Sequence, residues 1–216
     1  TNISNLNVLN SSLIRQTITY TITPKVLGGL ACAGPSVVVV ISIDPVPVVS
    51  SAATKSICSG VSVNYVPTAA VAGTVFNWTS SVTVGTVTGN TAVGGLGTIA
   101  DVLVNTTNVI GTVRYVITPV ANGCSGTPFN VDVTVDPQPT LSTVVTPLSQ
   151  VLCSNTAMVI DVNSATVPSA GSVVYDYVAV ASDVSVTGFT ASAINQSLAT
   201  NISNLNVLNS SLIRQT

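Results

Sequence analysis

Apolar and polar residues alternate along much of this chain with the two-residue period of a β-strand. From Phe129 to Asp136 the odd-numbered residues are apolar and the even-numbered residues are polar. Successive side chains of a strand point to opposite faces, so this pattern predicts one buried face and one solvent-facing face. Val113, Tyr115 and Ile117 repeat the alternation in the preceding segment. No segment carries a sustained helical period, and the chain is therefore predicted to be all-β.

Turn residues divide residues 46–137 into seven short segments of strand character. Their approximate bounds are 47–53, 61–66, 74–80, 82–88, 98–104, 111–118 and 128–135. Seven strands within about 100 residues are typical of an immunoglobulin-like β-sandwich. We therefore predict a complete seven-stranded sandwich over residues 46–137.

The chain also repeats itself. Residues 1–17 and residues 200–216 both read TNISNLNVLNSSLIRQT. A weaker repeat places residues 99–119 over 3–24 and residues 121–139 over 30–47. We expect the chain to be one period of a longer tandem array, with two homologous modules in each period.

This repeat pattern predicts three parts. Residues 1–45 are the C-terminal half of a sandwich whose front half lies in the preceding repeat. Residues 46–137 are the complete sandwich, and residues 138–216 are the N-terminal part of the next module, which continues in the following repeat. We expect residues 1–45 either to complete a sandwich with a front half from another copy or to lie exposed.

Two prolines stand at each predicted boundary, in Asp44-Pro45-Val46-Pro47 and in Asp136-Pro137-Gln138-Pro139. Proline fixes φ and removes a backbone donor, so these connections are expected to be short and stiff rather than flexible tethers. Sandwiches joined in this way would form an extended rod.

Charged residues make up 6% of the chain, against about 25% in ordinary globular domains. The net charge of −2 supplies no basic field for nucleic acid. The purest apolar run, Val37–Ile41, is far shorter than the roughly 18 residues of a membrane-spanning helix. We therefore expect no nucleic-acid partner and no membrane span in this segment.

The residues needed for catalysis are scarce. The chain has no histidine to serve as the base beside a nucleophile. Asp132 and Asp136 share a strand face but stand about 13 Å apart, at ~3.3 Å per residue. Gly94, Gly95 and Gly97 are not followed by the lysine and helix of a phosphate-binding loop. We expect no enzyme activity and no cofactor.

A metal site is also not expected. Calcium takes six to eight oxygen ligands, usually from clustered carboxylates. Asp44 and Asp136 each stand alone before a proline. Turn initiation, with the carboxylate bonded to its own nearby backbone, is the role that their position favours.

Four cysteines are present, and they lack the CxxC spacing of zinc sites. A secreted disulfide framework is favoured over buried free thiols. We predict a bond between Cys58 and Cys124, which would close a loop of about 66 residues and could stabilise the module by roughly 4 kcal/mol. Cys153 and Cys32 are expected to pair with cysteines of neighbouring repeats and not with each other.

Phe76 and Trp78 share one face of the strand predicted over 74–80, and Tyr175 and Tyr177 are their counterparts in the next module. Aromatic side chains at such positions fill a sandwich core. An exposed pair could instead stack on a sugar ring, which makes Phe76 and Trp78 candidate glycan contacts.

Val38 and Val40 replace Asn130 and Asp132 of the homologous strand on the face predicted to point outward. Two exposed valines can be harmless on a strand. Alternatively, they mark a surface that a neighbouring module or fibre partner covers.

Asn2, Asn10, Asn77, Asn105 and Asn195 lie in Asn-x-Ser/Thr sequences. This is the acceptor pattern for N-glycosylation. In a chain so rich in Asn, Ser and Thr, we expect most of these matches to be accidental.

The stretch YVITPVANGCSGTPFNVDVTVDPQP (115–139) resembles the PKD-like and Ig-like repeats of very large Bacteroidota surface proteins. These include the gliding-motility adhesins of the SprB type, which the type IX system secretes. A typical PKD domain has W-D-F-G-D-G after its third strand, whereas Trp78 is followed here by Thr79-Ser80-Ser81. The closer resemblance is therefore to the divergent PKD-like repeats.

The resemblance implies an extracellular, cell-surface filament or stalk that presents an adhesive tip or adheres along its length. The expected function is thus a structural and adhesive repeat segment, with neighbouring repeats as its partners. The alternative is an array of carbohydrate-binding sandwich modules that bind surface polysaccharide. No catalytic residue can be transferred from the family.

Overall fold

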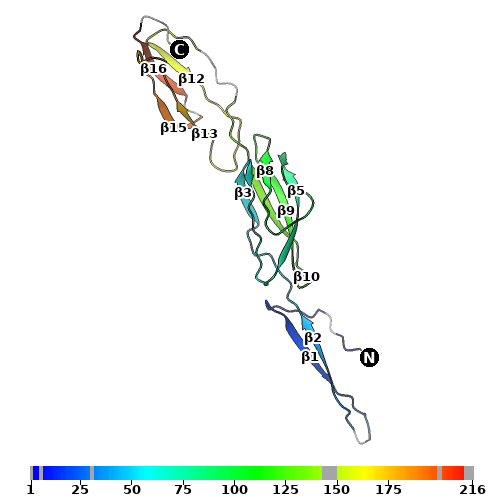
Figure 1. Cartoon of the computed structure of the whole chain (residues 1–216). Coiled ribbons are helices and arrows are strands. Elements are labelled where there is room, and N and C mark those ends of the chain that lie inside the picture. The colour runs from blue at the N-terminus through cyan, green and yellow to red at the C-terminus, as the bar shows by residue number, and fades with distance from the viewer. Residues whose placement is uncertain (1, 5–6, 30–31, 143–149, 199–200, 212–216) are drawn as a thin grey trace.

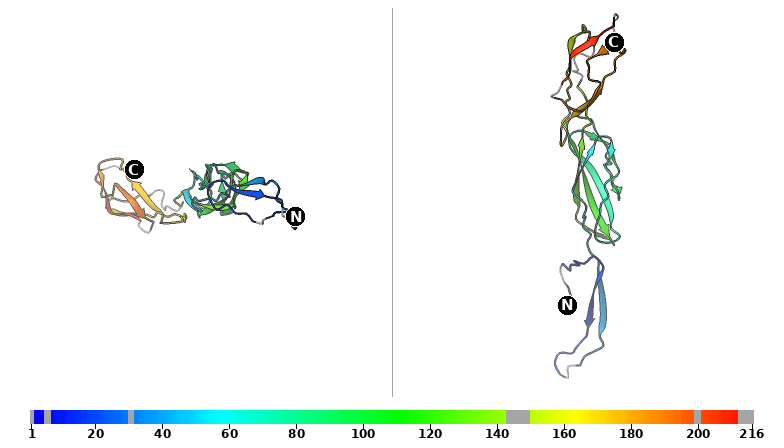
Figure 2. Two further views of the ribbon diagram at one scale, coloured as in Figure 1. Left: turned by 90° about the horizontal axis from the view of Figure 1, so that it is seen from below. Right: turned by 90° about the vertical axis from the view of Figure 1, so that its left-hand side faces the viewer.

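The computed structural model describes residues 2–4, 7–29, 32–142, 150–198 and 201–211. The chain is an extended rod of three bodies in line (Figures 1 and 2). The N-terminal body ends near residue 44, the middle body covers about 45–137, and the C-terminal body follows. Strands and loops, without a helix, make up the described residues, so the predicted all-β fold is confirmed.

The middle body is a sandwich of two sheets, and every one of its residues is described. The larger sheet has the order β3 (Thr54–Cys58), β11 (Phe129–Asp136), β9 (Gly111–Ala121), β5 (Val75–Val84) and β7 (Gly95–Leu96), with β10 (Cys124–Ser125) paired to β9. The smaller sheet has the order β4 (Val61–Ser62), β8 (Val102–Asn105) and β6 (Val87–Thr88). Strand β3 runs parallel to β11, and the other pairs are antiparallel.

The core of the middle body lies between these sheets. The alternating residues of β9 and β11 form one side of it and are fully buried: Val113, Tyr115, Ile117, Val131, Val133 and Val135. Val63, Ile99 and Leu103 come from the smaller sheet and its flanks and are also fully buried. The alternation in the sequence thus identified the inward face of both long strands correctly.

The predicted strands at 47–53, 74–80 and 82–88 differ from the structure. Residues 47–53 form no strand, and only Val49 makes an isolated bridge, to Ala69, because this segment is still part of the proline-rich connection. The first strand is β3, immediately after it. Residues 74–80 and 82–84 form one continuous strand, β5, whose register against β9 shifts between Val82 and Val84.

The N-terminal body is a hairpin of β1 (Gln16–Ile22) and β2 (Val37–Ile43). Ile18 lies opposite Ile41 and Tyr20 opposite Val39, which is the register of the homologous pairs Val113–Val133 and Tyr115–Val131 in β9 and β11. In the part of the chain that the structure describes, this hairpin has no second sheet packed on it.

The C-terminal body contains the elements that precede such a hairpin. One sheet has the order β12 (Thr156–Ile160), β16 (Ile202–Asn209) and β14 (Val186–Thr187), and a second pairs β13 (Val174–Val178) with β15 (Ser192–Ser197). The first sheet corresponds to β4, β8 and β6 of the middle body. Its pairing of Val186 with Asn209 repeats that of Val87 with Asn105.

The duplicated seventeen residues adopt two conformations. In the N-terminal copy, residues 2–4 and 7–10 have no regular secondary structure. In the C-terminal copy, the equivalent residues 202–209 form strand β16 between β12 and β14. Among the described residues, partner strands lie beside the second copy and not beside the first.

Candidate functional site at the module junctions

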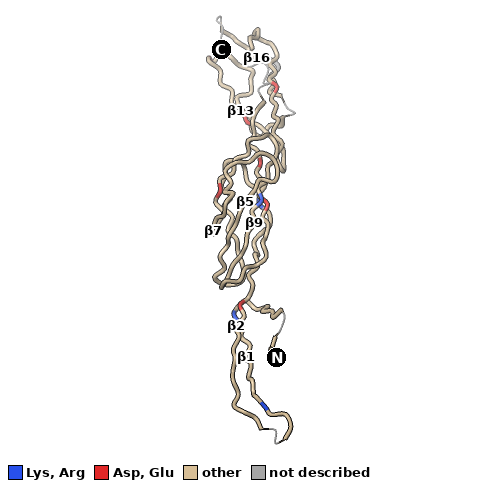
Figure 3. Tube along the Cα trace, turned by 90° about the vertical axis from the view of Figure 1, so that its right-hand side faces the viewer, with Lys and Arg blue, Asp and Glu red and all other residues tan. Residues whose placement is uncertain are grey.

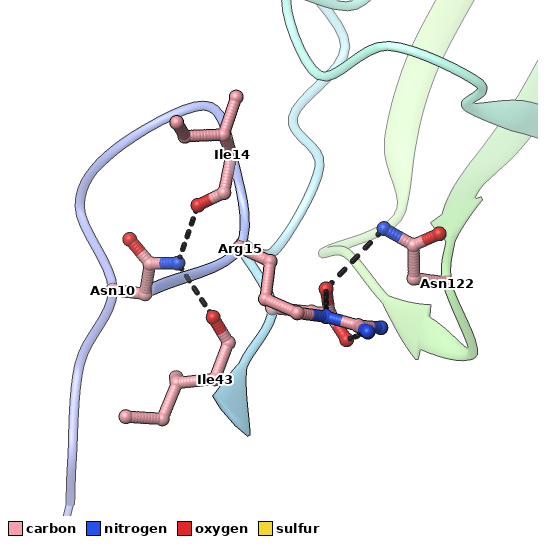
Figure 4. A network of polar contacts seen from close by, with 6 residues as sticks. Asn10, Ile14, Arg15, Ile43 and Asn122 are labelled. Atoms are coloured by element: carbon pink, nitrogen blue, oxygen red, sulfur yellow. Dashed lines mark hydrogen bonds and ion pairs between the residues drawn. The ribbon is translucent and has the colours of Figure 1, made fainter. Parts of the chain in front are cut away.

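The junction between the N-terminal and middle bodies is held by the carboxylate of Asp44. Arg15, just before β1, donates from Nε to Asp44 Oδ1 at 2.9 Å and from Nη2 to Oδ2 at 2.8 Å. Asn122, in the turn between β9 and β10 of the middle body, donates to Asp44 Oδ1 at 3.4 Å. Figure 4 shows the side chains of Arg15 and Asn122, which come from the two bodies and donate to the same carboxylate. One carboxylate therefore bridges the junction.

The electrostatics of this bridge favour the charged form of the carboxylate. The side chain of Asp44 is 14% exposed, whereas that of Arg15 is 59% exposed. Hydrogen bonds from the Arg15 guanidinium, with its charge, hold the pKa of Asp44 below its usual value. The bridge is therefore formed at neutral pH and weakens in acid.

Backbone packing adds to this contact. Pro45 and Pro47 are fully buried. A Cβ added at Gly126, just after β10, would lie 2.0 Å from the carbonyl oxygen of Pro47 and 2.8 Å from Pro119 Cγ. Only glycine lets the end of the middle body approach the connecting segment so closely. The connecting segment is thus packed against the end of the middle body.

The junction to the C-terminal body uses the homologous aspartate, Asp136, with a different partner. Its carboxylate accepts hydrogen bonds from the backbone N–H of Ser169 at 2.6 Å and from Ser169 Oγ at 2.8 Å. The N–H of Val167 donates to the carbonyl of Asn108 at 2.7 Å, which ties the same two bodies together. At both junctions, therefore, the carboxylate of an aspartate accepts a hydrogen bond from a residue of the neighbouring body.

The sequence-based prediction named the wrong hydrogen-bond partners for these two aspartates. Asp44 and Asp136 were expected to bond their own nearby backbone, but they bind Arg15, Asn122 and Ser169 instead. Arg15 lies 29 residues from Asp44 in the sequence, so no local pattern reveals the pair. Asn122 carried a signal, since Asn122-Gly123 is a two-residue hairpin turn with positive φ at both residues.

A second polar feature recurs in the modules and is formed by Asn-x-Ser/Thr sequences. Asn105 is 5% exposed. Its Nδ2 donates to the carbonyls of Val109 and Val135 at 2.7 and 2.9 Å, and its Oδ1 accepts from the N–H and the hydroxyl of Thr107 at 2.9 and 2.8 Å. We call this set of bonds the asparagine clasp. It ties the loop after β8 to the end of β11.

The clasp is reproduced at Asn10 in the N-terminal body. Asn10 Nδ2 donates to the carbonyls of Ile14 and Ile43, and its Oδ1 accepts from the N–H and hydroxyl of Ser12. At Asn209, the third copy, Oδ1 accepts from the N–H of Ser211. The serine or threonine two residues on is therefore a structural partner of the asparagine.

Phe76 and Trp78, the candidate glycan contacts, are core residues. They are 9% and 5% exposed, and the Trp78 ring meets Tyr115 edge-on with 5.5 Å between the ring centroids. Trp78 Nε1 is buried and has no hydrogen-bond partner among the described residues. The core interpretation is confirmed, and the sugar-platform alternative for this pair is wrong.

The predicted Cys58–Cys124 disulfide is also wrong. All four cysteines, Cys32, Cys58, Cys124 and Cys153, are free thiols in the structure. Cys58 lies opposite Asp136 at one end of the larger sheet, and Cys124 lies opposite Ala121 at the other end. About ten strand positions, or roughly 33 Å, separate these ends, whereas a disulfide requires Cα atoms within about 7 Å. The error arose because β3 pairs parallel to β11, which carries Cys58 away from the β9–β10 turn.

The surface of the rod carries few charges (Figure 3). Besides the Arg15–Asp44 pair, Arg114 and Asp132 form a salt bridge at 2.7 Å across β9 and β11. Within the described ranges, no group of three or more His, Cys, Asp or Glu residues is placed to hold a metal ion. The same residues include no apolar helix of a length that could cross a membrane.

Residues 55–139 match the PKD-like domain family. The middle body is therefore a PKD-like domain, as the sequence resemblance implied, and such domains are typical of extracellular proteins. The search of the curated proteins and the search of the solved structures found no match to this chain.

Proposed function

We propose that this chain is a structural and adhesive segment of an extracellular filament or stalk at the cell surface. The observation that carries the proposal is the locked junction, in which Asp44 accepts bonds from Arg15 of its own body and Asn122 of the next one. Buried prolines and the Gly126 contact leave this connection little freedom. A rod built in this way transmits force and sets reach, which a stalk requires and an enzyme does not.

The shape of the rod in solution tests this proposal. A compact chain of 216 residues would have a radius of gyration of about 17 Å. Small-angle X-ray scattering, extrapolated to zero concentration, is expected to give a clearly larger value and the pair-distance profile of a rod. A value near that of a compact chain would contradict the proposal.

The contribution of the junction is tested by Asp44→Ala. This substitution removes the acceptor of both Arg15 and Asn122, so we expect a broader distribution of bend angles between the first two bodies by electron microscopy. Asp132→Ala is the matched control, because it removes the same charge and also breaks a salt bridge with an arginine, but within one body. Equal flexibility in both variants would show that the Asp44 bridge does not stiffen the junction.

The chemistry of the surface supports the adhesive part of the proposal. It is nearly uncharged and rich in Thr, Ser and Asn, so contacts with glycans or with other filaments would be made by hydroxyl and amide groups. Binding of the chain to a glycan array tests this part separately. The alternative of a carbohydrate-binding array no longer has Phe76 and Trp78 as its sugar contacts, since both lie in the core.

The narrower hypothesis of a SprB-type gliding adhesin, secreted by the type IX system, rests on the sequence resemblance. Deletion of the gene in its host would abolish spreading on agar if it is correct. Unchanged spreading, with the filament lost from the surface, would limit the function to attachment.

A further inference from the structure

The β1–β2 hairpin presents an apolar face that has the composition of a sandwich core. Three residues of β1 and three of β2 form this face: Ile18, Tyr20, Ile22, Val39, Ile41 and Ile43. A groove of about 380 Å³ lies on the face, and Ile3, Ser4 and Val8 of the N-terminal segment also line it. Their counterparts in the middle domain are all fully buried. In the hairpin, Ile22, Val39 and Ile41 are 41%, 41% and 46% exposed instead.

The C-terminal body has a complementary groove between its two sheets. This C-terminal groove, of about 220 Å³, is lined by Met158, Val186, Phe189, Val207 and residues 179–182. Val186 and Val207 correspond to Val87 and Leu103, which are 5% and 0% exposed in the core of the middle domain. There, these two residues pack under β9 and β11, the strands that β1 and β2 reproduce.

The C-terminal body repeats hydrogen bonds found in the front half of the middle domain. Ser154 Oγ bonds the backbone of Asn209 in the way that Ser59 Oγ bonds the backbone of Asn105. The N–H of Asn155 donates to Val207 as the N–H of Gly60 donates to Leu103. The two ends of the chain therefore resemble the two halves of the middle domain.

We propose that the β1–β2 face of one copy of this chain docks into the C-terminal groove of a second copy. Together they form a complete two-sheet module like the middle domain, and the copies join head to tail. The two surfaces lie at opposite ends of a rod with stiff junctions (Figure 1), so they cannot meet within one chain without bending it. In the docked pair, residues 201–211 of the second copy would take the place of the docking copy's residues 2–12, of which Ile3, Ser4 and Val8 line the groove in the single chain.

The middle domain predicts which strands meet. There, β5 pairs with β9, with Thr79 opposite Val116. In the composite module, β13 of the second copy would pair with β1 of the docking copy, with Val178 opposite Thr21. The larger sheet would then continue from β15 and β13 of one chain to β1 and β2 of the other. Consecutive periods of a tandem array would meet through the same surfaces.

Two aspartate substitutions on the same strand test the proposal in the 216-residue chain. Ile41→Asp places an unpaired charge in the docked face, and we expect it to weaken association by at least about 100-fold. Val40→Asp is the control: it is on the opposite face and restores the residue type of its counterpart, Asp132. It should change association by less than about threefold. Sedimentation velocity over a concentration series provides the measurement.

The wild-type chain is expected to form concentration-dependent linear oligomers. A wild type that stays monomeric throughout the series, or two variants that weaken association equally, would overturn the proposal. Because sedimentation measures association whereas the scattering experiment measures the shape of the monomer, this inference and the proposed function can fail separately.

Cysteine cross-linking identifies the strands independently of the stability of the Ile41→Asp variant. In a background with the four native cysteines changed to serine, a chain with Thr21→Cys is mixed with a chain with Val178→Cys. We expect a disulfide-linked dimer, and no such dimer when Ser42→Cys on β2 replaces Thr21→Cys. Equal linking of both pairs, or no linking, would overturn the proposed register. An intrachain link in the Thr21→Cys, Val178→Cys double variant would indicate a closed monomer and overturn the role of a second copy.

Discussion

Replacing Asn105 with alanine removes all four hydrogen bonds of the asparagine clasp in the middle domain. At about 1 kcal/mol of net stabilisation for each bond, the upper estimate for the loss is about 4 kcal/mol. Water can replace the bonds at Val109 and Thr107, which lie near the surface. The carbonyl of Val135 loses a buried partner, however, which costs about 1–3 kcal/mol. We expect a net loss of about 2–3 kcal/mol.

Urea unfolding, followed through the emission of Trp78, measures this loss. Trp78 is the single tryptophan of the chain and lies in the core of the same domain, so the signal reports the middle domain alone. The expected loss corresponds to a decrease in Tm of roughly 10–20 °C for a domain of this size. A loss below about 0.5 kcal/mol would refute the assignment of the clasp as a structural element.

Two further variants separate the clasp from other effects. Asn130→Ala, on the exposed face of β11, should change stability by no more than about 0.5 kcal/mol. Asn10→Ala removes the equivalent clasp from the β1–β2 hairpin and should leave the Trp78 transition unchanged. A large effect of Asn10→Ala on that transition would mean that the bodies do not unfold independently.

Three other substitutions in the middle domain have defined outcomes. Tyr115→Phe removes the hydrogen bond that the buried hydroxyl donates to Asp101, and it should lower the free energy of unfolding by about 1–2 kcal/mol in urea titrations. Because burial and this bond raise the pKa of Tyr115, the wild type should also lose stability above about pH 10, and the variant should lose less. The hydrogen bonds from Arg114 lower the pKa of Asp132. The contribution of Asp132 to the free energy of unfolding is therefore fully present above its unfolded-state pKa and is lost as the pH falls through its folded-state pKa. Asp132→Asn should flatten the acid side of a plot of stability against pH. Gly95→Ala would place a Cβ 2.0 Å from the ring of Trp78, so the ring must move. We expect the displaced ring to give a red-shifted emission spectrum, and an unshifted spectrum would contradict the close packing.

Sequence reasoning recovered the fold of the middle domain because the alternation of Val113, Tyr115 and Ile117 identifies an inward face without knowledge of the partners. It failed at Cys58 and Cys124, where strand direction decides the distance between two side chains. It also missed the roles of Arg15 and Asn105, since the partners of both, Asp44 and Val135, are about 30 residues away. Contacts at that range depend on how the strands are arranged.

The duplicated segment shows most clearly what the sequence determines and what the tertiary structure decides. Its sequence determined that the residues suit a strand, through β-branched and small polar side chains, and it supplies the serine two residues after the asparagine that the clasp uses. Whether the strand forms was decided by the tertiary structure. Residues 202–209 pair with β12 and β14, whereas residues 2–4 and 7–10 have no such neighbours and no regular secondary structure. A strand satisfies its backbone hydrogen bonds only through other strands, so one sequence takes both conformations within a single chain.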